Sequence, residues 1–342
     1  MRYYSLLLVF ILFIGCAKKQ KPNPFTSVQI ETLYEDTLSI RAIEIMGNSL
    51  AFAANKGVFG SIDLTNNKVR TSVQRYDSIF PEFRAIAHNA TDFFMLSVAN
   101  PALLYKTGDN GQMDLVYQEV GEKVFYDAMT FWNDLEGIAI GDTVNGCLSI
   151  IITRDGGNSW NKIPCANLPN GIEGEGAFAA SNTNIKTLGD KVWIATTDSR
   201  IYYSGDKGKT WAVFETPIIK DEPTQGIYSI DFYDENLGVA IGGDYTKPEN
   251  PNANKALTKD GGKTWNLIAD GKIPSYKSCI QFVPNSDGKG IVALGFTGIT
   301  YSSTMGEAWT ELSSESFYTI RFLNDSIAYA AGKNRIAKLT FR

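Results

Sequence analysis

The sequence contains one histidine, His88, and this scarcity excludes several kinds of active site. A metal centre with two or three histidine ligands cannot be built from one chain, and a Ser-His-Asp or Cys-His mechanism would depend on His88 alone. Positive charge is also scarce, because 32 Lys and Arg residues face 37 Asp and Glu residues and the net charge is -5. Broad nucleic-acid binding needs a basic surface, so we expect no nucleic-acid partner. The residue pattern also indicates no metal and no cofactor.

The apolar run near the N-terminus is short, spanning only the nine residues 6–14. A membrane-spanning helix needs roughly 20 residues, so this run behind Arg2 is typical of a secretory signal. Its ending, Phe13-Ile14-Gly15-Cys16, resembles a bacterial lipobox. The resemblance implies a lipoprotein signal peptide at 1–15, lipidation of Cys16, a flexible tether at 16–27 and a location in the bacterial cell envelope, on the periplasmic face or the outer membrane. The alternative is a plain cleaved signal with an incidental cysteine.

Few cysteines remain after Cys16, and an exported protein folds where disulfides form. Cys147 and Cys165 lie symmetrically about residue 156, where we expect the tip of a hairpin. They would face each other across two antiparallel strands, so a disulfide between them is one possibility and two buried thiols are the other. Cys279 is expected in the core.

An octapeptide recurs along the chain, which is the main signal in the sequence. Successive copies start 46, 51, 54 and 44 residues apart. Three copies are complete and two are degenerate. The complete copies are TRDGGNSW (153–160), SGDKGKTW (204–211) and TKDGGKTW (258–265), and the degenerate ones are SSTMGEAW (302–309) and TGDNGQMD (107–114).

The octapeptide resembles the Asp box of BNR-type β-propellers, which include sialidases, sortilin-type receptors and photosystem II assembly factors. In this pattern the aspartate can accept hydrogen bonds within its turn, and the glycine supplies a backbone with positive φ. A calcium loop is the alternative, but the further carboxylates of an EF-hand do not follow. The chain also resembles bacterial BNR-repeat proteins often labelled oxidoreductases, although it has no dinucleotide or haem motif.

The resemblance and the internal repeat together predict an all-β fold, a single seven-bladed β-propeller over residues 28–342. Each unit of about 47 residues fits four short strands. The last unit, from Tyr318 to Arg342, holds only three strands. We expect the segment 28–35 to supply its fourth strand and so to close the ring, which hides the sheet edges. An open array, or six or eight blades, are the alternatives.

A candidate site follows when the first strands of the units are aligned, because these strands line the channel of a propeller. At the second position of each strand the residues are polar or Gly, and we expect them to converge at one channel mouth. Tyr228 and Lys277 directly precede two of them, and Glu173 lies in the glycine-rich approach to another. The aligned positions are Arg41, Arg84, Asp127, Glu175 or Gly176, Ser229, Ser278 and Thr319.

Two functions can be built from this mouth. In the alternative without a ligand, Asp127 and Glu175 pair with Arg41 and Arg84 at a solvated channel mouth. Otherwise the two arginines could grip a carboxylate or sulfate by bidentate hydrogen bonds. This hypothesis describes a monomeric, lipid-anchored binding or assembly scaffold with an unknown protein partner or an acidic glycan. In the alternative, Asp127 and Glu175 are the acid and base of a carbohydrate-active enzyme, a hydrolase or lyase acting on an acidic glycan. Sialidases use three arginines and only two are found at the mouth, so we favour the scaffold.

Overall fold

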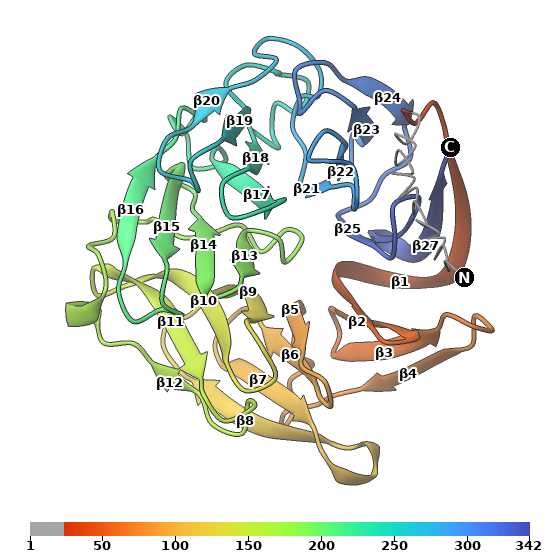
Figure 1. Ribbon diagram of the computed structural model, residues 1–342. Helices are drawn as coiled ribbons and strands as arrows, with labels where there is room; N and C mark the ends of the chain where they lie inside the picture. The colour runs from red at the N-terminus through yellow and green to blue at the C-terminus, as the bar shows by residue number, and fades with distance from the viewer. Residues whose placement is uncertain (1–23) are drawn as a thin grey trace, which may run out of the picture.

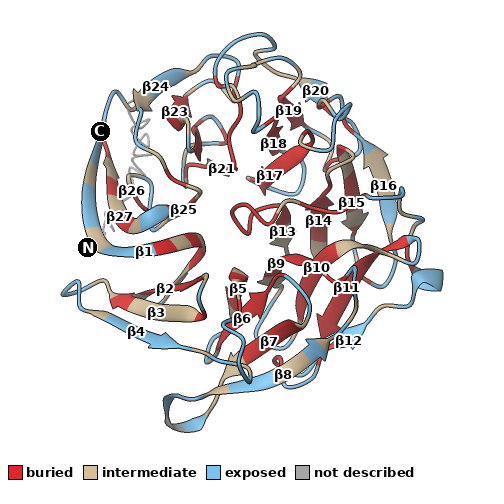
Figure 2. Ribbon diagram, turned by 180° about the vertical axis from the view of Figure 1, so that it is seen from behind, coloured by how far each residue is buried: buried red, intermediate tan, exposed pale blue. Residues whose placement is uncertain are grey.

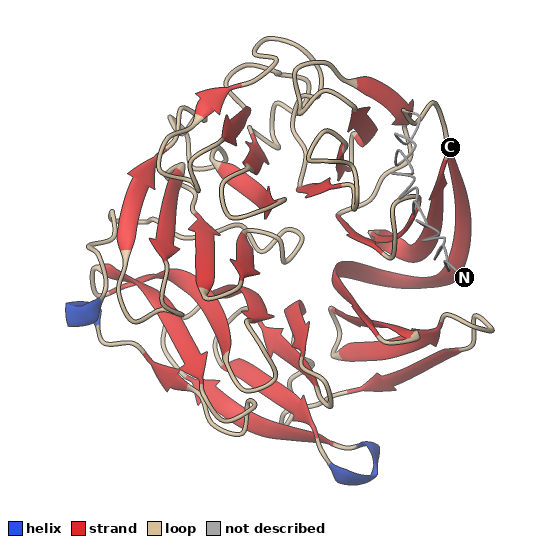
Figure 3. Ribbon diagram, viewed as in Figure 1, coloured by secondary structure: helices blue, strands red, loops and turns tan. Residues whose placement is uncertain are grey.

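The computed structural model describes residues 24–342, so the predicted signal peptide and Cys16 lie outside the described residues. The regular secondary structure of the described chain consists of antiparallel strands joined by loops (Figure 3), with two single-turn 3-10 helices, η1 (Asp109–Gly111) and η2 (Cys165–Asn167). Its sheets are arranged around a central axis like the blades of a propeller (Figure 1). The fold is therefore a β-propeller, as the repeat predicts.

Five of the sheets in the described chain have four strands each, paired in sequence order. Their strands are β5 (Phe83–His88), β6 (Phe93–Ser97), β7 (Ala102–Thr107) and β8 (Met113–Glu119); β9 (Tyr126–Phe131), β10 (Gly137–Val144), β11 (Cys147–Thr153) and β12 (Asn161–Lys162); β13 (Ile185–Leu188), β14 (Lys191–Ala195), β15 (Arg200–Ser204) and β16 (Ala212–Glu215); β17 (Ile227–Phe232), β18 (Gly238–Gly242), β19 (Lys255–Thr258) and β20 (Asn266–Leu267); and β21 (Cys279–Phe282), β22 (Ile291–Gly295), β23 (Gly298–Ser302) and β24 (Thr310–Ser313).

The remaining sheet joins the two ends of the described chain. It holds seven strands in the order β25 (Thr319–Phe322), β26 (Ile327–Ala331), β27 (Lys333–Phe341), β1 (Val28–Met46), β2 (Ser49–Ala54), β3 (Val58–Asp63) and β4 (Val69–Val73).

The long strand β1 belongs to both halves of this sheet. Its first part pairs with β27, from Val28 opposite Phe341 to Glu35 opposite Arg335. Its second part pairs with β2, ending with Met46 opposite Ser49. The segment 28–35 therefore supplies a fourth strand to β25, β26 and β27, which is where the sequence analysis places it.

Burial decreases from the axis to the rim (Figure 2). The inner strand β6 has the sequence FFMLS and is buried throughout, whereas four of the five residues of the outer strand β4 are exposed. Neighbouring sheets cover both faces of an inner strand, so inner strands are continuous apolar runs. The apolar core lies between adjacent sheets: Ile138 and Ile150 of one sheet, for example, pack in the same cluster as Ile194 and Tyr202 of the next.

The three complete octapeptides form equivalent turns between the third and fourth strands of their sheets. In the copy at 258–265, Asp260 accepts hydrogen bonds from the Thr264 backbone N–H (2.9 Å), the Thr264 hydroxyl (2.7 Å) and the Thr258 hydroxyl (2.8 Å). Gly262 has φ +85°, and the Trp265 indole donates to its carbonyl oxygen at 2.9 Å. These carboxylates are satisfied inside their own turns, so their role is structural.

The ring has two different faces, because antiparallel strands alternate in direction. The octapeptide turns lie on one of them, which we call the octapeptide face. The opposite face carries the loops between second and third strands and the loops that join one sheet to the next; we call it the pocket face. Cys147 and Cys165 form a disulfide on the pocket face, with their Cα atoms 5.5 Å apart.

Candidate functional site

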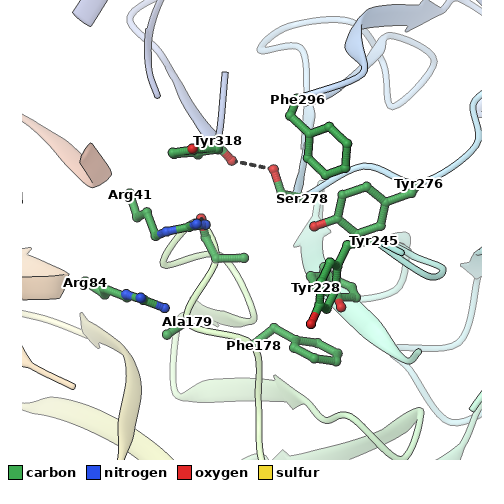
Figure 4. A pocket seen from close by; sticks show the side chains of 11 residues that line it. Arg41, Arg84, Phe178, Ala179, Tyr228, Tyr245, Tyr276, Ser278, Phe296 and Tyr318 are labelled. Atoms are coloured by element: carbon green, nitrogen blue, oxygen red, sulfur yellow. Dashed lines mark hydrogen bonds between the residues drawn. The ribbon is translucent and has the colours of Figure 1, made fainter. Parts of the chain in front are cut away.

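A pocket of about 410 Å³ opens at the centre of the pocket face (Figure 4), and we call it the mouth pocket. Four of the residues predicted to bind a ligand line it: Arg41, Arg84, Tyr228 and Ser278. The other lining residues are Phe178, Ala179, Ala180, Tyr245, Tyr276, Phe296 and Tyr318. The two arginines form one wall, and most of the aromatic rings lie across from them (Figure 4).

Arg41 is a charged group with few partners. Its Nη1 donates to the Ala180 carbonyl oxygen at 3.3 Å, and its guanidinium lies 4.2 Å from the centre of the Tyr318 ring. Its buried Nε has no hydrogen-bond partner, and no carboxylate within residues 24–342 forms an ion pair with it. Burial and the nearby charge of Arg84 lower the pKa of Arg41. Burying a charge without an opposite charge is unfavourable, so this side chain is suited to an incoming anion.

Arg84 is better compensated. Its Nε and Nη2 donate to Oε1 of Glu82 at 2.8 and 2.5 Å, and both side chains are partly exposed. The predicted pairing of the arginines with Asp127 or Glu175 is therefore wrong: Arg84 uses Glu82, and Arg41 uses a backbone oxygen.

The aromatic wall comes from three loops and the start of β17. Tyr228 stacks on Phe178 with the ring centres 3.7 Å apart, and Tyr276 meets Tyr228 edge-on at 4.8 Å. The centre of the Phe296 ring lies 5.2 Å from the centre of the Tyr276 ring. Burial raises the pKa of Tyr228 and of Tyr276, so both hydroxyls stay protonated at neutral pH. The wall offers apolar ring surface with a few hydroxyl groups.

The floor of the mouth pocket is the segment 177–184, which we call the plug. Apart from Phe178 its residues are small, and those from Ser181 to Asn184 are polar. The plug fills the channel by hydrogen bonding to first strands all around the ring. Asn182 alone connects two of them, donating to the Ile86 carbonyl oxygen at 2.7 Å and accepting from the Met129 N–H at 2.9 Å. Other plug atoms bond Arg41, Ser229, Ser278, Thr319 and Arg321.

The plug corrects the alignment of the fourth unit. The sequence analysis places Glu175 or Gly176 at the second position of a first strand, but that strand, β13, begins at Ile185. The run of small residues before it resembles a strand in composition, yet it forms the plug. Position 175 consequently lies outside the channel mouth.

Glu175 is instead the centre of a buried structural cluster. Its side chain is fully buried and pairs with Arg200, whose Nε donates to Oε1 at 2.9 Å. Tyr202 and Thr196 donate hydroxyl hydrogen bonds at 2.9 and 2.8 Å. Burial opposes ionisation, but Arg200 and these hydrogen bonds hold the pKa of Glu175 below its usual value. A carboxylate held in this way is not available as a catalytic acid.

Asp127 forms a second cluster, with Asp142 of β10. Asp127 is fully buried, and within residues 24–342 neither of its carboxylate oxygens has a hydrogen-bond partner. The Ala177 N–H donates to Asp142 at 3.2 Å. Burial and the neighbouring carboxylate raise the pKa of Asp127 well above its usual value, and burial raises the pKa of Asp142 to about 6. The two carboxyls are therefore suited to sharing a proton, and Asp127 does not line the mouth pocket.

The remaining predicted ligand residues also lie elsewhere. Ser229 is buried beside the plug, where its Oγ accepts from the Ile280 N–H at 2.9 Å. Lys277 donates to Thr297 and to the Gly298 carbonyl oxygen, and burial lowers its pKa to about 8. Glu173 lines a separate, wider cavity of about 600 Å³ on the same face, together with Glu122, Lys123 and Asp142. None of these three residues lines the mouth pocket.

Sequence reasoning missed Phe178, Tyr276 and Phe296 as lining residues. Tyr276 lies two positions before the aligned residue Ser278, whereas Tyr228 lies one position before Ser229, so the alignment gave no signal for Tyr276. Phe178 and Phe296 lie in loops whose lengths differ between units, so alignment of the first strands could not find them.

The opposite mouth of the channel contains a smaller polar pocket of about 220 Å³. There Arg321 pairs with Glu44 at 2.8 Å, and Lys186 pairs with Asp231 at 2.7 Å. These charges compensate each other, so the opposite mouth lacks the unpaired arginine of the mouth pocket.

Two further properties concern the part of the chain that the structure describes. Within residues 24–342 no three His, Cys, Asp or Glu side chains are grouped so that they could hold a metal ion. Over the same range there is no helix with the length and apolar character needed to cross a membrane.

Comparisons with known proteins support the fold. A family model described as "Sortilin-Vps10: Sortilin, neurotensin receptor 3" matches residues 148–294, and no curated protein matches the chain. Among solved structures, the RRP9 WD40 repeats are 11% identical with a TM-score of 0.66, covering 94% of this chain and 100% of that chain. YCF48 bound to D1 peptide is 10% identical with a TM-score of 0.66, covering 94% and 99%. YCF48 from Cyanidioschyzon merolae is 13% identical with a TM-score of 0.60, covering 93% and 99%. At such identities the likeness concerns the fold, and the chain is a β-propeller with a sortilin-like stretch in its middle.

Proposed function

We propose that this protein is an exported, lipid-anchored β-propeller that binds a partner protein by an anionic group placed in the mouth pocket. The observation that carries the proposal is Arg41, a partly buried guanidinium in a pocket wall that forms no ion pair within residues 24–342. A carboxylate of a partner would supply the missing opposite charge and accept hydrogen bonds from Arg41 and Arg84. The chain would then act as a binding or assembly scaffold.

The likenesses agree with a binding role. One structural neighbour, YCF48, is described as bound to a D1 peptide, and sortilin, named in the matching family model, is a receptor by its description. We also infer seven blades, counting the seven-stranded sheet as two blades that share β1, and we interpret the octapeptide turns as Asp boxes.

The location in the cell envelope is inferred from the sequence before residue 24. The lipobox-like ending at Cys16 indicates acylation, which would tether the ring to a membrane surface. The disulfide between Cys147 and Cys165 is suited to an oxidising compartment outside the cytoplasm.

The enzyme hypothesis has less support. Its proposed acid and base, Asp127 and Glu175, lie in two separate buried clusters. Within residues 24–342, Glu82 is the only carboxylate that forms an ion pair with an arginine of the mouth pocket. A glycosidase needs two carboxyl groups facing the scissile bond. An acidic glycan therefore enters the experiment below as a competing ligand.

The test is binding of acidic probes to the mature protein. The probes are acidic peptides, sialic acids, uronic acids and sulfated sugars, measured by calorimetry and by thermal shift. A specific probe at 100 times its dissociation constant stabilises the fold by about 2.7 kcal/mol.

The variants are Arg41→Ala and Arg84→Ala, with Arg70→Ala as the matched control because Arg70 is exposed on the outer strand β4. We expect acidic peptides to bind the wild type and the control, and to lose at least tenfold in affinity for the two pocket variants. Binding of sugars alone would favour the glycan hypothesis. Binding that is equal in all four proteins would place the anion site elsewhere and refute the proposal.

A further inference from the structure

Large apolar side chains that remain exposed are unevenly distributed over the two faces. Eleven such residues occur within residues 24–342. Seven of them lie in loops of the pocket face, and Val73 lies at the end of β4, where the chain enters such a loop. Leu135 and Leu323 lie in turns of the octapeptide face, and Leu115 lies on the outer strand β8. A single exposed apolar residue is ordinary, but their gathering on one face indicates an interaction surface.

Five of the exposed apolar residues lie at the mouth pocket or in loops that lead to its two walls. Tyr245 and Phe296 line the pocket itself, on the side opposite Arg41 and Arg84 (Figure 4). Ile273 lies three residues before Tyr276, in the loop leading to the same wall, and is 51% exposed. We call Tyr245, Ile273 and Phe296 the aromatic bank.

The other bank is the loop before β5, which carries Arg84. Phe80 in this loop is 46% exposed, and the guanidinium of Arg75 lies 4.3 Å from the centre of its ring. An isolated bridge between Tyr76 and Ile79 closes the loop, and Ile79 is itself exposed. The ring of Phe80 is thus held at the surface by Arg75 rather than folded into the core. We call Ile79 and Phe80 the arginine bank.

We propose that the partner is an extended protein segment that carries one carboxylate with apolar side chains on both sides of it. The carboxylate would enter the mouth pocket and pair with Arg41, while the apolar side chains would cover the two banks. This inference rests on the proposed function, because the anion in the pocket fixes the register of the segment.

Charge and geometry both select this occupant. The carboxylate would form an ion pair with Arg41. A purely apolar partner would instead leave the Arg41 charge buried without an opposite charge. The banks lie on both sides of the pocket, so an apolar group on one side only would leave the other bank exposed. An acidic sugar satisfies the arginines but offers no apolar side chains to Phe80 and Ile273. Apolar contacts on both sides of a charged anchor are the usual arrangement of a binding hot spot.

The experiment is a selection from a library of random nine-residue peptides against the mature protein. The second target is the double variant Phe80→Ser with Ile273→Ser, and the third is Arg41→Ala. Leu323→Ser serves as the control, because Leu323 is 43% exposed but lies on the octapeptide face. Thermal unfolding of all the variants identifies any that have lost the fold, and Phe80→Ala with Ile273→Ala replaces a double variant that does not fold.

We expect the wild type and Leu323→Ser to enrich peptides with one Asp or Glu and apolar residues on both sides. The double variant should still prefer the acidic residue, lose the apolar preference and bind the wild-type peptides at least tenfold more weakly. Selection against Arg41→Ala should enrich neither acidic residues nor flanking apolar residues. Enrichment for acidic residues without flanking apolar ones would overturn this inference and leave the proposed function standing. Enrichment of no peptide, or of peptides without acidic residues, would overturn both.

Discussion

Two groups of aspartates on opposite faces of the ring have pKa values that are shifted in opposite directions. On the octapeptide face, burial opposes ionisation of Asp206 and Asp260, but hydrogen bonds from their own turns hold the pKa of each at about 2. On the pocket face, burial raises the pKa of Asp127 well above its usual value and that of Asp142 to about 6. The donors to Asp206 and Asp260 lie within five residues of each aspartate in sequence. The pocket face holds charges that its own chain does not fully compensate, which is typical of a site that meets a partner.

The largest loss of stability on the pocket face is expected from a substitution in the plug. Asn182→Ala would leave the buried Ile86 carbonyl oxygen and the Met129 N–H without partners. At about 1–3 kcal/mol for each unsatisfied group, we expect a loss of roughly 3 kcal/mol in the free energy of unfolding, measured in urea. Asn170→Ala, at an exposed position before the plug, should lose less than about 0.5 kcal/mol. Equal stability of the two variants would mean that the plug does not tie the first strands together.

The octapeptide face can be tested by comparing a complete copy with a degenerate one. Asp260→Ala removes the acceptor of four hydrogen bonds, from Thr258, Lys263 and Thr264, and we expect a loss of about 2 kcal/mol. In the degenerate copy Thr304 stands at the position of the aspartate. Its hydroxyl accepts one backbone hydrogen bond, from the Ala308 N–H at 2.9 Å, and contacts the Ser302 hydroxyl at 3.3 Å. Thr304→Ala should therefore cost about 0.5–1 kcal/mol. A cost for Thr304→Ala as large as that for Asp260→Ala would show that the carboxylate adds nothing to the turn.

The pH dependence of stability should have opposite signs for the two groups of aspartates. The folded-state pKa values of Asp127 and Asp142 are raised, so their contribution is fully present below about pH 4 and is lost as the pH rises through about 6. The pKa values of Asp206 and Asp260 are lowered, so their contribution is present above about pH 4 and is lost as the pH falls towards 2.

Asp127→Asn tests this difference, because it removes one of the two interacting carboxyls. We expect the variant to lose less stability than the wild type between pH 5 and 7, with a difference of about 1 kcal/mol, measured by chemical denaturation across that range. Asp260→Ala serves as the comparison and should leave the slope between pH 5 and 7 unchanged. An unchanged slope for Asp127→Asn would argue against a shared proton.

The smallest expected effect concerns Arg41. Because its charge is uncompensated, Arg41→Ala should change the free energy of unfolding by less than about 0.5 kcal/mol, while abolishing anion binding. Arg321 at the opposite mouth pairs with Glu44 and donates to the Thr319 hydroxyl at 3.1 Å. Removing Arg321 would leave Glu44 without its opposite charge, so we expect Arg321→Ala to lose about 2 kcal/mol in the same thermal or urea measurement. A large loss for Arg41→Ala would mark Arg41 as structural.

The sequence by itself determined the β-propeller, the positions of the octapeptide turns and the strand 28–35 that pairs with β27. It also placed Arg41, Arg84, Tyr228 and Ser278 on one mouth. These features repeat along the chain or depend on neighbouring residues, so a pattern in the sequence can show them.

Only the tertiary structure decided how the mouth is filled and which charges are paired. Asn182 meets Ile86 and Met129, which are 96 and 53 residues away in sequence, and Glu175 meets Arg200 across two strands. Phe178 and Phe296 reach the pocket from loops of different lengths. Such contacts depend on the direction of single side chains in the closed ring, and no local pattern specifies that direction.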